Sequence, residues 1–259
     1  MDATKIETEE GTQYHLKVKQ GDLNPTVLIP GDPKRALKIA TQWDSSKKVA
    51  DYRQYVSFSG VYKKAPISVT STGIGPAACE IAMNELKNVG IQNLIRVGSC
   101  GALQPEIELG DLVISQAAVR LEDTSDHYAM KAFPAVASRM VTDALVRACE
   151  EQNLAYHVGI TASSSSFYNG QGRPAWNNYL PSHRQNLVDD LTNAGVLNFE
   201  MEASLLFVLG SIFKMEVGAV CTVYASRPRN EFATVGEDKA ILAANEAARI
   251  IYEEHYDQL

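Results

Sequence analysis

The seven residues "FYNGQGR" at 167–173 bring together side chains that could bind a small planar ring. Phe167 offers a flat apolar face, Gln171 carries both a hydrogen-bond donor and an acceptor, and Arg173 presents five fixed donors. Two glycines in so short a stretch argue against a regular helix or strand and favour a loop. The set suits a heterocycle that carries carbonyl oxygens, although a solvated surface loop uses the same residue types.

Two other segments could bind an anion. In "PGDPKR", Gly31 would let the backbone approach the anion at a helix N-terminus, and Arg35 follows about one turn later. In "RVGSCG", Arg96 stands near the end of an apolar stretch and is followed by Ser99 between glycines. An arginine beside such a serine suits an oxyanion, whereas a capped turn or an ion pair would explain either segment taken alone.

A pair of glutamates and a further arginine complete the candidate residues. In "NFEMEASLL", Glu200 and Glu202 flank Met201 where an extended stretch turns into a helix. A carboxylate could accept two hydrogen bonds from a vicinal diol, with the methionine against the apolar face of a sugar. A glutamate at a helix start could equally be a partner of the helix dipole. In "YASRPRNEF", Arg227 lies just past an apolar strand.

The elements that would position these residues mostly alternate between strand and helix. After a short apolar run at 26–30, the patterns predict strands at 65–72, 91–98, 110–121, 155–163 and 217–226, and helices at 34–43, 77–90, 138–152, 201–213 and 239–256. The stretch at 52–66 predicts an antiparallel hairpin around Gly60.

This order predicts an α/β fold: one domain over residues 1–259, with a central mixed, largely parallel twisted sheet flanked by helices. In such folds ligands bind at the carboxyl ends of strands, which is where the candidate residues stand.

Composition and charge exclude several classes of protein. The chain has 259 residues, of which 45% are hydrophobic and 21% charged, as in ordinary globular proteins. The net charge of −7 and the lack of a basic block argue against a nucleic-acid or membrane partner. No apolar run approaches the ~18 residues of a membrane span, and the acidic N-terminus does not resemble a signal peptide. We therefore expect a cytoplasmic protein.

Several common site motifs are missing from the sequence. The cysteines form no CxxC pair and the histidines form no HExxH motif, so we expect free buried thiols and no zinc site. The sequence contains neither GxxxxGK[ST] nor GxSxG, and "STGIG" is only part of a dinucleotide-binding motif.

Taken together and in order, the segments resemble a known family. "IPGDPKR", "STGIGPAACEIAMNEL", "IRVGSCGALQPEIELGD", "FYNGQGR" and "NFEMEAS" resemble the nucleoside phosphorylases of the trimeric/hexameric α/β type, most closely their uridine phosphorylase branch. The resemblance extends from about Tyr14 to the terminal helix. It implies reversible phosphorolysis of uridine to uracil and ribose 1-phosphate in pyrimidine salvage, with inorganic phosphate as co-substrate and no cofactor. It also implies a homohexamer, a trimer of dimers, in which the dimer is the smallest active unit.

The resemblance also implies a role for each candidate residue. The phosphate would be bound by Gly31, Arg35, Arg96 and Ser99, with Arg53 supplied by a neighbouring subunit. The ribose would be bound by Met201 and Glu202, with His15 from the neighbour. The base would be bound by Phe167, Gln171, Arg173, Glu200 and Arg227. Arg96, Arg173 and Arg227 would be catalytic, because departing uracil is an anion that fixed cations stabilise.

Some departures from the family pattern bear on specificity and on metal binding. Purine-cleaving relatives carry an aspartate after the last core strand, where this chain reads "ASRPR". Ala78 and Glu80 replace small polar residues, and Gln54 stands where some relatives carry glutamate. Relatives bind a monovalent cation with that glutamate and with a serine at the position of Ala78, so we predict no metal here.

Three alternatives stay open at this point: a purine nucleoside phosphorylase, a nucleosidase of the same fold, and a non-catalytic nucleoside-binding protein. The anion-binding residues argue against hydrolysis, because attack by water needs no anion site.

Overall fold

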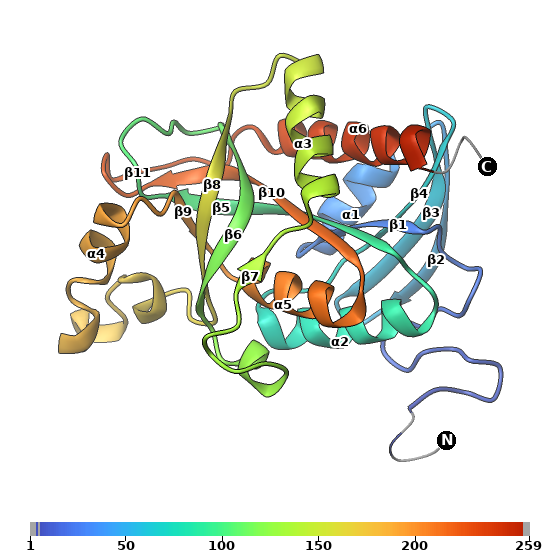
Figure 1. The fold of residues 1–259 in the computed structure, drawn as a ribbon, viewed down its shortest axis with the longest axis horizontal. Helices are drawn as coiled ribbons and strands as arrows, with labels where there is room; N and C mark the ends of the chain where they lie inside the picture. The colour runs from blue at the N-terminus through green and yellow to red at the C-terminus, as the bar shows by residue number, and fades with distance from the viewer. Residues whose placement is uncertain (1–3, 5, 256–259) are drawn as a thin grey trace.

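An eleven-stranded sheet runs through the part of the chain that the computed structural model describes, residues 4 and 6–255 (Figure 1). The strands are β1 Thr26–Pro30, β2 Ser45–Tyr52, β3 Tyr55–Tyr62, β4 Ala65–Thr70, β5 Asn93–Ala102, β6 Leu112–Leu121, β7 Ala135–Val136, β8 Tyr156–Ser164, β9 Asn198–Glu200, β10 Glu216–Ser226 and β11 Glu231–Phe232. The helices are α1 Pro33–Ala40, α2 Pro76–Asn88, α3 Arg139–Glu151, α4 Leu187–Asn193, α5 Ala203–Phe213 and α6 Glu237–His255.

The sheet is mixed, and part of it closes on itself. Strand β5 pairs in parallel with β1 and with β10, and antiparallel with β9. Strand β10 pairs with β6, β6 with β8, and β8 with β9, so that these pairings join β5, β10, β6, β8 and β9 into a ring. Closure of the ring sets Glu200 of β9 directly opposite Ser163 of β8. The expected α/β fold is thus confirmed, and its sheet is more strongly curved than the strand order alone indicates.

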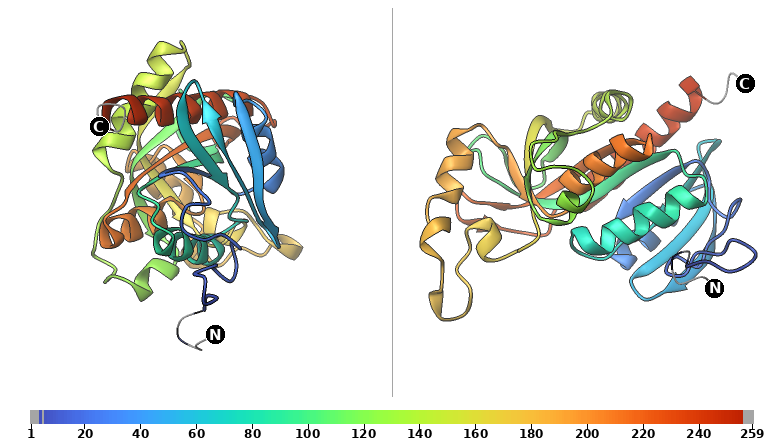
Figure 2. Two further views of the ribbon diagram at one scale, coloured as in Figure 1. Left: turned by 90° about the vertical axis from the view of Figure 1, so that its right-hand side faces the viewer. Right: turned by 60° about the horizontal axis from the view of Figure 1, so that its bottom comes forward.

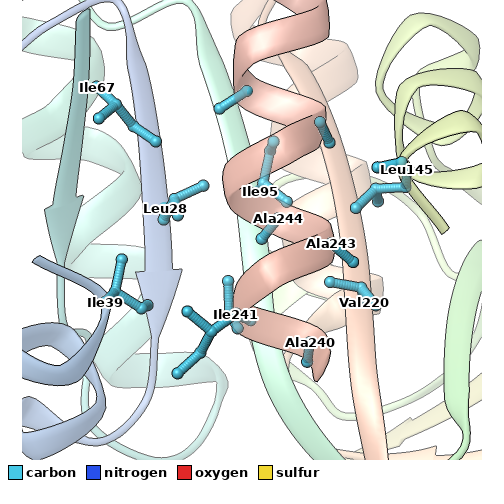
Figure 3. Packing of buried hydrophobic residues seen from close by; sticks show 14 of the residues in the cluster. Leu28, Ile39, Ile67, Ile95, Leu145, Val220, Ala240, Ile241, Ala243 and Ala244 are labelled. Atoms are coloured by element: carbon cyan, nitrogen blue, oxygen red, sulfur yellow. The ribbon is translucent and has the colours of Figure 1, made fainter. Parts of the chain in front are cut away.

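Helices cover both faces of the sheet and enclose two apolar cores. Helices α1, α3 and α6 lie on one side, and α2 and α5 lie on the other (Figures 1 and 2). On α6, Ala240, Ala243 and Ala244 let the helix pack close above Ile95 of β5 and Val220 of β10 (Figure 3). The packed helices hold the strands in a fixed arrangement, so the residues at the strand ends are placed on a rigid support.

The "GDP" segment begins α1 for a clear local reason. The side chain of Asp32 accepts a hydrogen bond from the backbone N–H of Lys34 at 2.8 Å, and Pro33 occupies the first turn. The capped-turn interpretation of this segment is therefore confirmed, and the cap fixes the start of the helix that carries Arg35.

The predicted hairpin around Gly60 is wrong in the position of its turn. Gly60 lies inside β3, and the turns fall at Arg53 and at Lys63–Lys64, all of which have positive φ. A Cβ atom on Gly60 would lie 2.1 Å from the carbonyl oxygen of Ser45 in β2, so the glycine is needed for close backbone approach. The polar strand β2 carried no apolar alternation that could have predicted it.

The remaining differences concern boundaries and short elements. Strand β5 extends to Ala102, beyond the expected end at residue 98, and α6 begins at Glu237 rather than at residue 239. The last residue of the predicted terminal helix, Tyr256, lies outside the described residues. Helix α4 was not predicted. Within residues 4 and 6–255, no helix combines the length and the apolar character that crossing a membrane requires.

We predict that Gly60→Ala lowers the free energy of unfolding by about 1–3 kcal/mol, because backbone atoms of β2 cannot move aside easily. Gly101→Ala is the matched control, since its added Cβ would lie 3.6 Å from its nearest neighbours, an ordinary contact. Urea denaturation of both variants measures the difference. Equal and small losses in the two variants would contradict the assignment of Gly60 to a crowded strand.

Candidate active site

A cavity of about 320 Å³ opens at the carboxyl ends of β1, β5, β9 and β10. It is lined by most of the residues that the sequence singled out: Gly31, Arg35, Arg96, Ser99, Phe167, Gln171, Arg173, Glu200, Met201 and Glu202. Three of the proposed residues, His15, Arg53 and Arg227, do not line it. Residues from four separate motifs therefore meet around one volume.

Arg96 is the central cation of the cavity wall. It is almost fully buried, and its Nε donates to Glu200 Oε2 at 2.9 Å while its Nη2 lies 2.5 Å from Glu202 Oε2. The other carboxylate oxygen of Glu202 accepts the backbone N–H of Gly75 at 2.6 Å. Burial raises the pKa of Glu202, and the positive charge of Arg96 opposes that rise. Arginine and glutamate therefore depend on each other for their charge in this buried place.

Glu200 connects Arg96 with strand β8 and with the start of helix α5. Its carboxylate accepts the hydroxyl of Ser163 and the backbone N–H groups of Glu202 and Ala203, the latter at the first turn of α5. Together with Arg96, these partners occupy both carboxylate oxygens. Glu200 therefore positions Arg96 and the first turn of α5, and its expected contact with the base stays a prediction.

A glycine makes room for the guanidinium of Arg96. A Cβ atom on Gly98 would lie 2.9 Å from Arg96 Nη2 and 2.7 Å from Cys221 Sγ, both closer than real contacts allow. The sequence showed several glycines in "RVGSCG" but gave no sign of which one was required. The requirement arises because the guanidinium of Arg96 lies against Gly98, two residues further along the same strand.

The loop after β8 is preorganised by its own side chains. Arg173 Nη1 donates to the carbonyl oxygen of Phe167 at 2.9 Å and to Gln171 Oε1, and the guanidinium lies 4.2 Å from the centre of the Phe167 ring. Burial and the neighbouring Arg227 lower the pKa of Arg173 to about 10, which still leaves it protonated at neutral pH. Gln171 is only 3% exposed, so a ring bound here would meet desolvated polar groups.

Arg227 supports this loop rather than facing the cavity. Its terminal nitrogens donate to the carbonyl oxygens of Gln171 and Gly172 at 3.3 and 3.4 Å. Gly172 adopts a positive φ of 67°, a conformation that glycine accepts without strain. Arg227 thus supports the loop that carries Gln171 and Arg173, and its expected part in binding the base and in catalysis stays a prediction.

His15 and Arg53 lie together on another surface. His15 Nδ1 is 2.6 Å from Glu85 Oε1, and its ring packs edge-on against Tyr14 at 4.8 Å between centroids. The exposed Arg53 guanidinium lies 6.0 Å from the centre of the same Tyr14 ring. Figure 2 shows the N-terminal segment at the opposite end of the molecule from the loop after β8. Both residues assigned to a neighbour thus share one face, remote from the loop of their own subunit.

The cavity also contains residues that sequence reasoning missed. They include Ile74 from the loop before α2 and one residue from each of four strands: Cys100 of β5, Phe199 of β9, Tyr224 of β10 and Phe232 of β11. Ile74 could have been found, because an apolar residue between two glycines directly after a strand is unusual. Phe232 carried no such signal, since it lies on the two-residue strand β11 and is 72% exposed. All four cysteines are buried free thiols, as expected.

Comparison with known proteins gives consistent matches. Residues 25–253 match the family model of the phosphorylase superfamily. The uridine phosphorylase of Thermococcus kodakarensis is 52% identical over 251 residues, covering 97% of this chain and 91% of that protein. The uridine phosphorylase of Escherichia coli K12 is 36% identical, covering 91% of this chain and 96% of that protein. The guanosine phosphorylase of Halorubrum lacusprofundi is 37% identical, covering 82% of each chain.

We predict that Arg96→Met lowers the free energy of unfolding at pH 7 by about 3–5 kcal/mol, because two buried carboxylates lose their cation. Burial already raises the pKa of Glu202 above its ordinary value, and without the charge of Arg96 it would rise further. Protonation would then favour the folded variant, so the deficit should shrink as the pH falls toward 4. Denaturation at a series of pH values measures this.

Arg139→Met is the control for that experiment, because Arg139 is 93% exposed and pairs with Asp143 on the surface. It should change stability by no more than about 0.5 kcal/mol. A deficit in Arg96→Met that does not vary with pH would contradict the dependence on carboxylate charge.

Proposed function

The chain belongs to the phosphorylase superfamily, and from this we propose that it catalyses the reversible phosphorolysis of uridine to uracil and ribose 1-phosphate. The observation that carries the proposal is the single cavity in which buried arginines, a carboxylate and an amide–guanidinium loop converge. These groups match, in turn, the phosphate, the ribose and the pyrimidine. The names of several relatives at 35–52% identity agree with it.

Phosphate is proposed to bind between Gly31, Arg35, Arg96 and Ser99, all of which line the cavity. The two buried guanidinium groups can donate charge-assisted hydrogen bonds to a phosphate oxygen. A nucleosidase would have no use for this arrangement, since attacking water carries no charge.

Glu202 and Met201 are proposed to hold the ribose. Glu202 Oε2 pairs with Arg96, and Oε1 accepts the N–H of Gly75, which aligns the carboxylate and leaves lone pairs for the 2′- and 3′-hydroxyls. Met201 would contact the apolar face of the sugar.

The reaction then needs no covalent enzyme intermediate. The bond between C1′ and N1 breaks first, its electron pair leaves with uracil, and the sugar gains oxocarbenium character. A phosphate oxygen on the opposite face stabilises that cation and forms the new bond to C1′. Arg173 stabilises the negative charge on the carbonyl oxygens of departing uracil, so its effect belongs to the transition state. Inorganic phosphate is the co-substrate, and the scheme assigns every step to side chains and phosphate without a cofactor.

The proposal extends to assembly and location. His15 and Arg53 would complete the pocket of a neighbouring subunit, which makes a dimer the smallest active unit and a hexamer, a trimer of dimers, the full assembly. The shared face of these two residues supports a common partner. Four free buried thiols support a cytoplasmic place, where the reaction would serve pyrimidine salvage.

We predict that the protein cleaves uridine only when phosphate is present, and prefers uridine over inosine by several orders of magnitude in kcat/KM. A purine would leave two or three buried polar groups unpaired, at about 1–3 kcal/mol each. Cytidine should also react poorly, because its 4-amino group donates where uracil accepts. Product release from uridine, thymidine, inosine and cytidine, with and without phosphate, measures this.

Variants of the loop test, in the same assay, whether Arg173 and Gln171 determine turnover and base preference. Arg173→Ala should lower kcat on uridine by about 10²-fold or more, and Gln171→Ala should narrow the gap between uridine and cytidine. Arg147→Ala, a surface residue paired with Glu254, is the control and should match the wild type. Efficient inosine cleavage would favour a purine nucleoside phosphorylase, cleavage without phosphate a nucleosidase, and binding without cleavage a non-catalytic protein.

We further predict that mixed subunits restore activity. Arg53→Ala would damage the pocket of the neighbour, whereas Arg173→Ala would damage the pocket of its own subunit. A hybrid dimer therefore contains one intact site, and re-associated mixtures of the two inactive variants should recover part of the wild-type rate. Re-association of each variant with itself is the control. Inactive hybrids, or a fully active monomer, would refute the shared pocket.

A further inference from the structure

The guanidinium of Arg35 is held by three different elements. Its Nε donates to Glu237 Oε1 at 2.6 Å, its Nη1 donates to the carbonyl oxygen of Val97 at 3.1 Å, and its Nη2 donates to Tyr224 Oη at 3.5 Å. A guanidinium has five N–H donors, so one N–H remains on each terminal nitrogen. These two N–H groups are available to donate to an oxyanion, because Glu237, Val97 and Tyr224 occupy the other three.

Glu237 forms an ion pair with Arg35 from outside the cavity. It is the first residue of α6 and is not among the residues that line the cavity, whereas Arg35 is. Its second oxygen accepts Lys38 Nζ at 3.0 Å, and Lys38 lies one turn after Arg35 on α1. Although burial raises the pKa of Glu237, the hydrogen bonds from Arg35 and Lys38 lower it below its ordinary value. The carboxylate is therefore ionised at neutral pH and ties α1 to α6.

We propose that Glu237 is a positioning residue for phosphate binding: it holds Arg35 through Nε so that the free N–H groups of Nη1 and Nη2 stay directed at the anion. The inference rests on the proposed function for the identity of that anion as inorganic phosphate. Without this contact, Arg35 must be ordered when phosphate binds, and the lost freedom of a long side chain weakens binding.

The geometry shows that Glu237 does not compete with phosphate for the terminal nitrogens of Arg35. A carboxylate that competed with phosphate would occupy the terminal nitrogens of Arg35, but Glu237 occupies Nε. Lys38 holds its other oxygen in place. Carboxylate and phosphate can therefore bind the same guanidinium at once, because they use different nitrogens.

The test is a calorimetric titration of the folded protein with inorganic phosphate. Glu237→Ala should raise the phosphate Kd by about tenfold. Glu237→Gln should raise it less, because the amide oxygen can still accept from Nε. Asp238→Asn is the control, since Asp238 is exposed and pairs with Lys38 rather than with Arg35, and it should leave Kd within about twofold.

A double variant separates positioning from a structural role. In an Arg35→Met background, Glu237→Ala should cause no further rise in Kd, because the group that it positions is absent. In steady-state kinetics, Glu237→Ala should raise the KM for phosphate and leave the KM for uridine within about twofold. A helix-anchoring role would instead lower the folded fraction, which changes the apparent kcat and neither KM.

Three results would overturn the proposal: an unchanged Kd in Glu237→Ala, a tighter Kd, or an equal rise in the Arg35→Met background. If Glu237→Ala fails to fold, Glu237→Gln decides by the same criteria. A wild-type protein that binds phosphate but does not cleave uridine would refute the proposed function while the titration still tests the role of Glu237. A wild type that binds no phosphate refutes both.

Discussion

The ion pairs of Arg96 with Glu200 and Glu202 are the constraint on which the rest of the structure depends. A buried guanidinium is tolerated only where carboxylates and hydrogen bonds replace its water shell. Here one carboxylate comes from the short strand β9 and the other from the residue before α5, so the arginine of β5 determines where both elements lie. The closed ring of strands is the framework that makes this meeting possible, because β9 pairs with β5 on one side and β8 on the other.

This charge balance supports the proposal that a neighbouring subunit completes the phosphate site. Arg96 is already opposed by two carboxylates, and Arg35 is opposed by Glu237. A phosphate dianion therefore meets little uncompensated positive charge within the subunit. An additional cation from outside would correct that deficit, and Arg53 is exposed on a face that a second subunit could present. The proposed shared pocket would supply this additional charge.

The base end of the cavity follows a different principle. Its polar groups are fixed by one another: Arg173 bonds to Gln171 and to the Phe167 carbonyl oxygen, and Arg227 holds the loop backbone. Desolvated groups in fixed positions discriminate by what they leave unpaired, so specificity arises here, whereas the arginines at the other end supply charge.

The sequence by itself determined the alternation of strands and helices, and it identified most residues of the cavity, because glycine-flanked polar residues after apolar strands are visible in a local pattern. Tertiary structure decided the rest. The roles of Glu200 and Gly98 depend on strand pairing and on the path of one side chain, and Glu237 meets Arg35 across 202 residues of chain. Such contacts leave no local signal, because periodicity records which face of an element is buried and not which charged group it will face. The predicted turn at Gly60 was wrong for the same reason, because the glycine is needed there for the close approach of a neighbouring strand.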